Sequence, residues 1–201
     1  KKIITAATIF DDTEQDFENN YHPTDYSKSL GKITVRRAVE SSQNIPFVEI
    51  MEKLKPKNSI KYLEKMGVTT LTEEDNSLPL ALGGLEKGIS PLQMAGAYST
   101  IANDGIYIEP TFYTKIDKND GTVFIKTSQK TKRVCSKQVA YILKEILTQP
   151  VLGENGTATY CKISGVDVAA KTGTTDENYD RWLCGFTPYY TAVTWYGYDQ
   201  N

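Results

Sequence analysis

Apolar residues recur at helical spacing along much of the first 150 positions of the chain. One such group covers residues 35–39, and Thr34 stands directly before it, where a side-chain oxygen can cap a helix. Pro46 interrupts the pattern, and because proline inside a helix loses a hydrogen bond, a second helix is predicted to begin there. Asn58 is predicted to cap a third helix. Residues 1–30 are polar and turn-rich, which predicts an extended loop.

Two later helices carry clearer start signals. Ser90-Pro91-Leu92-Gln93 combines a serine cap, a proline in the first turn and a glutamine three residues on, and it predicts a helix that ends near Asn103. Ser136 is predicted to cap another helix. The apolar stripe of that helix consists of Val139, Ile142, Leu143, Ile146 and Leu147.

The pattern becomes strand-like in the last fifty residues. Three runs rich in Val, Thr, Trp and Tyr cover residues 166–171, 181–186 and 191–198, and the Tyr and Trp of the third run are expected in the core. Another pair of strands is expected within residues 107–126, separated by the turn Asn119-Asp120-Gly121. Helices followed by a cluster of antiparallel strands predict an α+β fold, with helices packed on an antiparallel sheet.

Composition narrows the class of protein. The 201 residues are 39% hydrophobic and 24% charged, as in soluble globular proteins. The net charge of −2 does not favour a nucleic-acid or membrane-surface binder, and no apolar run approaches membrane-spanning length. Three cysteines, an odd count without metal-ligand spacing, argue against a disulfide framework. A bridge between Cys161 and Cys184 stays open beside the simpler interpretation of small buried residues.

One candidate for chemistry is the segment Lys171-Thr172-Gly173-Thr174, at the end of a strand-like run. A lysine followed by small hydroxyl residues on a strand edge makes an anion-binding ledge. The ammonium supplies positive charge, the hydroxyls donate to a carboxylate, and the glycine lets a ligand approach the backbone. Alone, the tripeptide is equally typical of an ordinary strand that runs into a turn.

A second candidate is Ser42-Gln43-Asn44, at the junction of two predicted helices. A serine and an asparagine two positions apart on a turn can both point into one cleft, the hydroxyl for proton transfer and the amide for holding a peptide group. The local alternative is that Asn44 simply caps the helix that begins near Pro46.

Together and in this order, the two elements match two of the three signature motifs of penicillin-binding proteins and serine β-lactamases: Ser-x-x-Lys, Ser-x-Asn and Lys-Thr-Gly. From about Ile4 onward, the chain resembles class A (bifunctional) penicillin-binding proteins. The resembling stretches are Thr34 to Val48, Leu82 to Pro110 and Val168 to Asp199. The resemblance implies the penicillin-binding/serine β-lactamase-like fold, with residues 1–201 as the C-terminal portion of a single transpeptidase domain, truncated at both ends.

The third motif, the Ser-x-x-Lys that carries the nucleophilic serine, is not found in its expected place in this chain. The chain's Ser-x-x-Lys runs from Ser29 to Lys32, lies only thirteen positions before Ser42, and holds Gly31 where a helical turn would be needed. In the family the nucleophile begins a buried helix well ahead of the Ser-x-Asn motif. The resemblance therefore implies a nucleophilic serine upstream of Lys1, so that this chain alone would be inactive.

The resemblance also implies roles for the motif residues. In the family, a serine attacks the penultimate D-alanyl carbonyl of a peptidoglycan stem peptide, and the acyl-enzyme passes to an amine of a neighbouring stem. Ser42 would relay a proton, Asn44 would hold a substrate amide, and Lys171 would attract the terminal carboxylate. Thr172, Gly173 and Thr174 would bind the substrate, and the Thr174 N–H would form half of the oxyanion hole.

The implied setting follows from the same family. β-Lactams would enter the site as substrate mimics, no metal or organic cofactor would be needed, and no nucleic acid would bind. The missing part of the domain and a glycosyltransferase domain would belong to the same polypeptide, anchored by an N-terminal segment on the extracytoplasmic face of the bacterial membrane. Two rivals are a serine β-lactamase or β-lactam sensor, and a non-catalytic module of the same fold that binds wall peptides.

Overall fold

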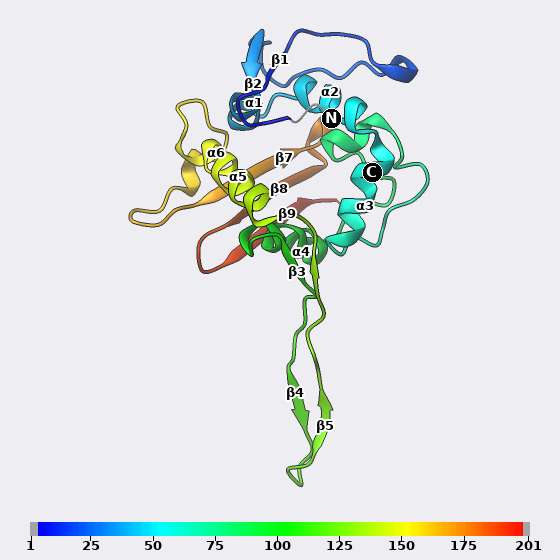
Figure 1. Ribbon diagram of the computed structural model, residues 1–201, viewed down its shortest axis with the longest axis vertical. Helices are drawn as coiled ribbons and strands as arrows, with labels where there is room; N and C mark the ends of the chain where they lie inside the picture. Colours follow the sequence, from blue (N-terminus) through cyan, green and yellow to red (C-terminus); the bar gives the residue numbers. More distant parts are fainter. Residues whose placement is uncertain (1–3, 199–201) are drawn as a thin grey trace.

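A three-stranded antiparallel sheet organises the second half of the molecule in the computed structural model, which describes residues 4–198 (Figure 1). Its order is β7-β8-β9, so β7 is an edge strand with β8 in the centre. The strands are β7 Ala169–Thr174, β8 Asp180–Phe186 and β9 Thr191–Gly197. The register places Lys171 opposite Cys184. The three predicted strands are confirmed, although the first begins at Ala169 rather than at residue 166 and continues past Lys171 to Thr174. The α+β class is confirmed as well.

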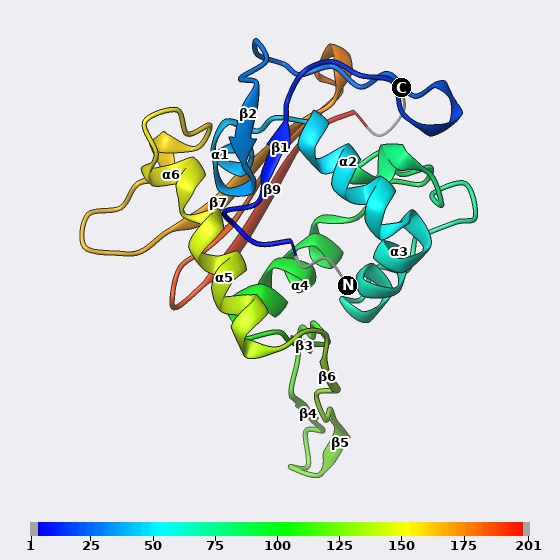
Figure 2. The same ribbon diagram turned by 45° about the horizontal axis from the view of Figure 1, so that its top comes forward.

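Helices from both halves of the chain pack around this sheet. Helix α4 (Pro91–Ala102) contacts β8 and β9, whereas α5 (Lys137–Leu147) and the short α6 (Gln149–Leu152) contact β7. In Figure 2, α5 and α6 lie on one side of the molecule and α2 and α3 on the other. The predicted capping box is confirmed: the Ser90 hydroxyl accepts from the Gln93 N–H, and the Gln93 side chain accepts from the Ser90 N–H.

The first sixty-five residues form a small ribbon followed by three helices. Strand β1 (Ile9–Asp11) pairs antiparallel with β2 (Lys32–Thr34), so the predicted loop at the start of the chain is partly wrong. Helices α1 (Val35–Ser41), α2 (Ile45–Leu54) and α3 (Pro56–Lys65) follow. Thr34 caps α1 as predicted, accepting from the Arg37 N–H at 3.2 Å, and Pro46 lies in the first turn of α2.

Two further predictions are wrong. Asn58 does not cap α3, because the helix already begins at Pro56 and the Asn58 amide donates to the carbonyl of Leu54 at 2.9 Å. The aromatic residues of the last strand are not all in the core. Tyr196 is 74% exposed, since alternate residues of β9 point away from α4.

One hydrophobic cluster joins α2 to the segment that precedes α4. Its buried members are Phe17, Ile45, Val48, Met51, Leu78 and Leu80. Leu78 and Leu80 belong to the 3₁₀ helix η2 (Leu78–Leu82). The described residues hold three other 3₁₀ helices: η1 (Glu18–Asn20), η3 (Thr159–Cys161) and η4 (Asp176–Asn178). This cluster fixes the start of α2, and with it the turn that carries Ser42-Gln43-Asn44.

A long β-ribbon projects from the body between α4 and α5 (Figure 1). Its base pairs β3 (Ile106–Ile108) with β6 (Thr131–Arg133), and its outer part pairs β4 (Lys115–Asp117) with β5 (Val123–Lys126). The predicted turn at Asn119-Asp120-Gly121 joins β4 to β5 and is confirmed, with Gly121 at φ +82°. The outer part is exposed throughout.

The cysteines are all unpaired. Cys184 is buried, while Cys135 and Cys161 are partly buried, so the predicted alternative of a Cys161–Cys184 bridge is wrong. Among residues 4–198, no helix has both the length and the apolar character needed to cross a membrane.

Candidate active site

Two residues 129 positions apart in sequence meet at the outer edge of β7. The Nζ of Lys171 donates a hydrogen bond to the Oγ of Ser42 at 2.6 Å. Lys171 comes from the edge strand, and Ser42 from the turn between α1 and α2. The contact joins the two motifs that the sequence singled out.

Ser42 reaches this position through an unusual backbone conformation. Its φ of 56° and ψ of 41° lie in the left-handed region, which few residues other than glycine adopt. The Ser42 N–H closes α1 on the carbonyls of Ala38 and Val39, and the Gln43 N–H bonds the Ala38 carbonyl at 3.0 Å. The turn therefore ends one helix and aims the hydroxyl of Ser42 at β7. Strain of this kind is common at functional sites.

Lys171 is a lysine with little access to water. Burial, the largest effect, lowers its pKa from 10.5 to about 8, and the neighbouring Cys184 on β8 opposes this shift. Its ammonium also donates to the carbonyl oxygen of Thr172 at 2.8 Å. A lysine with such a pKa can hold or release a proton near neutral pH.

The backbone of β7 presents donors on the same outer edge. The N–H of Thr175 donates inward, to the Asp180 carbonyl at 3.1 Å. Because successive amides of a strand point to opposite sides, the N–H of Thr174 points outward, away from β8. Gly173 has room for a methyl group, 3.4 Å from the Trp182 Cβ, so packing does not require glycine there.

The hydroxyl of Thr172 has a partner that sequence reasoning missed. It lies 2.9 Å from the hydroxyl of Thr157, in the loop after α6. That loop is tied to α1, because the Asn155 N–H donates to the Glu40 carboxylate at 3.1 Å. Gly153 packs so closely against Glu40 that a Cβ would clash, and this glycine is the sequence signal for the close approach of the loop to α1.

Asn44 lies at the start of α2 but does not cap it with its side chain. Its amide donates to the carbonyl of Thr24 at 2.7 Å, and its backbone N–H donates to the carboxyl of Asp25. The local capping alternative is therefore wrong. The structure brings Ser42 and Lys171 together, and holds the amide of Asn44 against the segment that follows His22.

Ser29 is not positioned like a nucleophile paired with a lysine on a helix. Its hydroxyl donates to the backbone carbonyl of Asp12 at 2.6 Å, and Lys32 is the first residue of strand β2. No helical turn joins the two residues, which confirms the reason given for rejecting this Ser-x-x-Lys.

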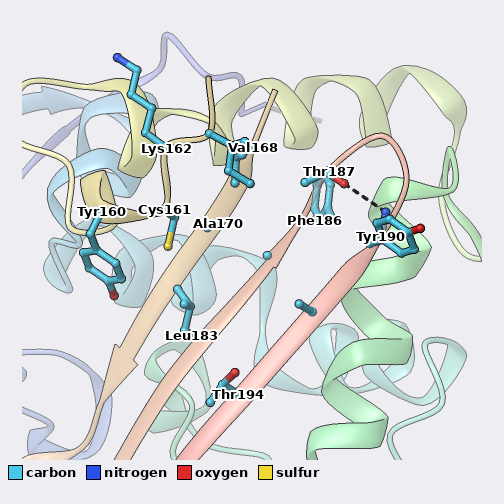
Figure 3. A pocket seen from close by; sticks show the side chains of 13 residues that line it. Tyr160, Cys161, Lys162, Val168, Ala170, Leu183, Phe186, Thr187, Tyr190 and Thr194 are labelled. Carbon is cyan, nitrogen blue, oxygen red and sulfur yellow. Dashed lines mark hydrogen bonds between the residues drawn. The ribbon is translucent and has the colours of Figure 1, made fainter. Parts of the chain in front are cut away.

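A separate apolar cavity of about 420 Å³ lies on the sheet, with its lining residues drawn in Figure 3. It is lined by Ala170, Leu183 and Thr194, among others. Successive side chains of a strand point to opposite faces of the sheet. Lys171 follows Ala170, and Cys184 follows Leu183. The cavity, which Ala170 and Leu183 line, therefore opens on the face opposite to Lys171 and Cys184. It is thus distinct from the contact between Ser42 and Lys171.

The described residues contain no group of three or more His, Cys, Asp or Glu side chains placed to hold a metal ion. Ser42 and Lys171 bring together a hydroxyl and an ammonium of lowered pKa. The edge strand that carries Lys171 adds an outward backbone amide at Thr174. Such a set can transfer a proton and stabilise a negatively charged oxygen.

A family profile described as the penicillin binding protein transpeptidase domain matches residues 1–199. Penicillin-binding protein 1A of Clostridium botulinum is 35% identical over 212 residues, covering 100% of this chain and 25% of the relative. Penicillin-binding protein 1F of Bacillus subtilis is 38% identical over 189 residues, covering 90% of this chain and 26% of the relative. The chain thus spans about a quarter of the length of these curated relatives.

Solved structures have the same fold. Penicillin-binding protein 1A from Haemophilus influenzae superposes with a TM-score of 0.86 and 22% identity, covering 98% of this chain and 35% of that chain. The PonA1 protein from Mycobacterium tuberculosis in complex with penicillin V superposes with a TM-score of 0.81 and 23% identity. This match covers 96% of this chain and 55% of the PonA1 chain.

Proposed function

The chain belongs to the penicillin-binding protein transpeptidase family, and we propose that it forms the substrate-binding part of a peptidoglycan D,D-transpeptidase that works through an acyl-serine intermediate. The observation that carries this proposal is the 2.6 Å hydrogen bond between Lys171 Nζ and Ser42 Oγ. It supports the assignment of two signature motifs to one site, which neither motif could do alone.

Ser42 and Lys171 supply proton transfer in this proposal. The hydroxyl of Ser42 relays a proton between the reacting groups and the lysine of the third motif, and the ammonium of Lys171 polarises that hydroxyl. Because Lys171 is largely buried, its charge acts with little screening by water. The same charge attracts the terminal carboxylate of a stem peptide.

Thr172, Gly173 and Thr174 bind the substrate along the outer edge of β7. Thr174 is exposed and its N–H points outward, which suits it to stabilise the oxyanion of the tetrahedral intermediate. Gly173 has no side chain, so it lets the substrate backbone approach the strand closely. In the structure the Thr172 hydroxyl donates to the Thr157 hydroxyl. When a carboxylate binds, Thr172 donates its proton to the carboxylate instead and can accept one from Thr157.

Asn44 holds a substrate amide in the family pattern, and its contacts support a role in fixing the turn as well. Its N–H and its amide are both anchored to the segment of Thr24 and Asp25. This anchoring keeps the hydroxyl of Ser42 directed at Lys171.

The attacking serine, in this proposal, is supplied by another part of the polypeptide that precedes residue 1, so that residues 1–201 are the C-terminal portion of one transpeptidase domain. The bonding of Ser29 to the Asp12 carbonyl supports this view, since it leaves Ser29 without a helical lysine partner.

The relatives are bacterial penicillin-binding proteins, and one solved relative binds penicillin V. We propose that β-lactams acylate the same site in the complete polypeptide. A glycosyltransferase domain in that polypeptide, and an N-terminal anchor that holds it on the extracytoplasmic face of the membrane, complete the proposal.

The proposal is tested by labelling the complete polypeptide with a fluorescent penicillin. We expect one labelled serine, located outside residues 1–201 by peptide mapping. Ser42→Ala is expected to slow acylation by roughly 10²–10⁴-fold, as for loss of a proton-transfer group. Ser41→Ala is the matched control, because the neighbouring Ser41 hydroxyl is buried without a hydrogen-bond partner among the described residues.

Two results would contradict the assignment. The first is labelling of Ser29, which would make the short Ser-x-x-Lys the nucleophile motif. The second is an equal loss of rate in Ser41→Ala and Ser42→Ala, which would mean that the turn matters only for folding.

A further inference from the structure

The β-ribbon that projects between α4 and α5 differs in charge from the rest of the chain (Figure 1). Residues 105–135 hold six basic and three acidic side chains, a net charge of +3, whereas the entire chain carries −2. The second strand of the ribbon, residues 122–133, comprises β5 and β6 and contains no acidic residue. Its four basic residues are Lys126, Lys130, Lys132 and Arg133. A basic strand therefore projects from a body that is acidic.

Part of this positive charge is not balanced within the molecule. Among residues 4–198, Lys126 and Lys132 form no ion pair. Lys126 lies directly opposite Lys115 in the register of β4 and β5, and like charges in that arrangement destabilise a strand pair. Lys115 has a partner in Asp117 at 2.9 Å. Lys126 is thus the member of the pair whose repulsion a bound anionic group would relieve.

The same strand has free backbone hydrogen-bonding groups along its outer edge. Strand β5 pairs only with β4, and β6 only with β3, so no neighbouring strand covers this edge among the described residues. The Thr127 N–H donates inward, to the Thr114 carbonyl at 3.0 Å. Because successive amides of a strand point to opposite sides, the Lys126 N–H points to the open edge. An edge of this kind can pair with an added strand.

The outer part of the ribbon has two chemically different faces. Ile116 and Ile125 lie opposite each other across the two strands and are 39% and 36% exposed. Since side chains alternate along a strand, these isoleucines lie on the face opposite to Lys115 and Lys126. A strand added at the edge would meet isoleucines on one face and lysines on the other. Its complement is an extended peptide in which apolar and acidic residues alternate.

We propose that the outer edge of residues 122–133 binds an extended acidic segment of a partner protein, which joins the ribbon as a third strand. The backbone of that segment pairs with the open edge, and its acidic side chains lie beside Lys126 and its basic neighbours. Its apolar side chains extend the isoleucine face. The basic edge discriminates between partners, because lysines on an edge repel basic strands and attract acidic ones.

Other anionic partners fit fewer of these features. A phosphate polymer would pair with the lysines but would leave the backbone edge and the isoleucine face without contacts. An anionic membrane would meet the tip of the ribbon first, and residues 117–122 hold two acidic, one basic and no apolar side chain. A second copy of the ribbon would bring like charges together. The acidic strand is the partner that uses the edge, the charge and the apolar face at once.

The test measures binding of a fluorescent peptide to the complete polypeptide by anisotropy. The probe is a peptide of four Val-Glu repeats, and the control probe has four Val-Lys repeats. We expect the glutamate peptide to bind and the lysine peptide not to bind. Lys126→Glu should weaken binding by at least about tenfold, since a like charge then faces the peptide. Lys61→Glu, which makes the same change of charge at an exposed position of α3, should leave binding unchanged.

A second probe separates strand addition from simple attraction between charges. The glutamate peptide with every backbone nitrogen methylated keeps its carboxylates but has no N–H to donate, and we expect it not to bind. Hydrogen exchange of the complete polypeptide, followed by mass spectrometry, should slow within residues 122–133 when the unmodified glutamate peptide binds. Exchange in α3 should stay the same.

Three results would overturn the inference. The first is that the glutamate peptide does not bind, and the second is that its methylated form binds equally well. The third is that sodium polyphosphate or phosphatidylglycerol vesicles bind as tightly as the peptide and are equally weakened by Lys126→Glu. Penicillin labelling of the same samples reports on the proposed function separately, because the ribbon lies outside the contact between Ser42 and Lys171.

Discussion

At the scale of single residues, the environment of Lys171 decides the behaviour of the site. A solvent-exposed lysine would stay charged well beyond neutral pH, whereas burial brings the pKa of Lys171 down to about 8. The hydrogen bonds to Ser42 and to the Thr172 carbonyl both require its N–H groups. Its charge is therefore available at neutral pH but is close to being lost.

We expect the acylation rate of the complete polypeptide to fall as the pH rises through about 8, because Lys171 then loses its proton. Lys171→Arg should be slower at neutral pH, since a guanidinium cannot reproduce the ammonium geometry, but its rate should not fall over this range. Rates of fluorescent penicillin labelling below and above pH 8 measure both effects.

Lys162→Arg is the matched control, since Lys162 is exposed and outside the site. It should retain the alkaline fall of the wild type. A fall that persists in Lys171→Arg would assign the titration to another group, such as the lysine of the third motif.

Whether a site residue could be predicted from the sequence depends on whether its signal is local or comes from a distant partner. Ser42 and Lys171 were predictable because their motifs are local in sequence. Thr157 was not, since it acts through Thr172, a partner that only the fold brings close. Single serines, threonines and aspartates carry no sequence signal for such contacts.

At the scale of elements, caps and turns were predicted well and burial less well. Ser136 caps α5 as expected, accepting from the Val139 N–H at 3.3 Å. Yet Val139 is 47% exposed and Ile142 is 45% exposed, although both belong to the predicted apolar stripe. Helical spacing identifies an apolar face, but only tertiary packing decides how much of that face is covered.

The outer β-ribbon is expected to contribute less to the stability of the fold than any other element. All residues of β4 and β5 are exposed, and the two strands pair only with each other. A two-stranded ribbon contributes little stability by itself. We expect that replacing residues 114–127 by Asn-Gly leaves the thermal midpoint and penicillin labelling of the complete polypeptide nearly unchanged.

The control lies at the base of the ribbon. Gly105 has a φ of +81°, and a Cβ there would lie 2.6 Å from the carbonyl oxygen of Cys135. Gly105→Ala should therefore destabilise the fold by about 1–3 kcal/mol. If the ribbon deletion lowered the midpoint as much as Gly105→Ala, the ribbon would be part of the folding core.

At the scale of the whole molecule, the chain exposes more surface than its mass requires. Its accessible surface is 13151 Å², whereas about 9,500 Å² is typical of a compact protein of 22.5 kDa. The ribbon accounts for some of the excess. The open face of the sheet, where Tyr160 is 71% and Tyr190 is 80% exposed on the rim of the cavity, is a second exposed region (Figure 3).

Large exposed apolar side chains gathered around an apolar cavity are typical of an interface. The sheet face was not predictable from the sequence, because alternation along β8 and β9 does not reveal which face is covered. The matched structures extend well beyond the region that this chain covers. We therefore expect the remainder of the domain to cover the sheet face in the complete polypeptide.

Residues 1–201 produced alone should then bind a hydrophobic dye such as anilinonaphthalene sulfonate and should show no covalent penicillin label. Adding the preceding part of the domain, on the same chain or as a second polypeptide, should lower dye fluorescence and restore labelling together. The reason is that one event covers the sheet and supplies the serine.

Two variants serve as controls in the two-chain experiment. Ala192→Arg places a charge on the cavity lining and should weaken both responses, whereas Lys118→Arg on the ribbon should weaken neither. Dye binding that is unchanged on reconstitution, despite restored labelling, would show that the sheet face stays open in the assembled enzyme.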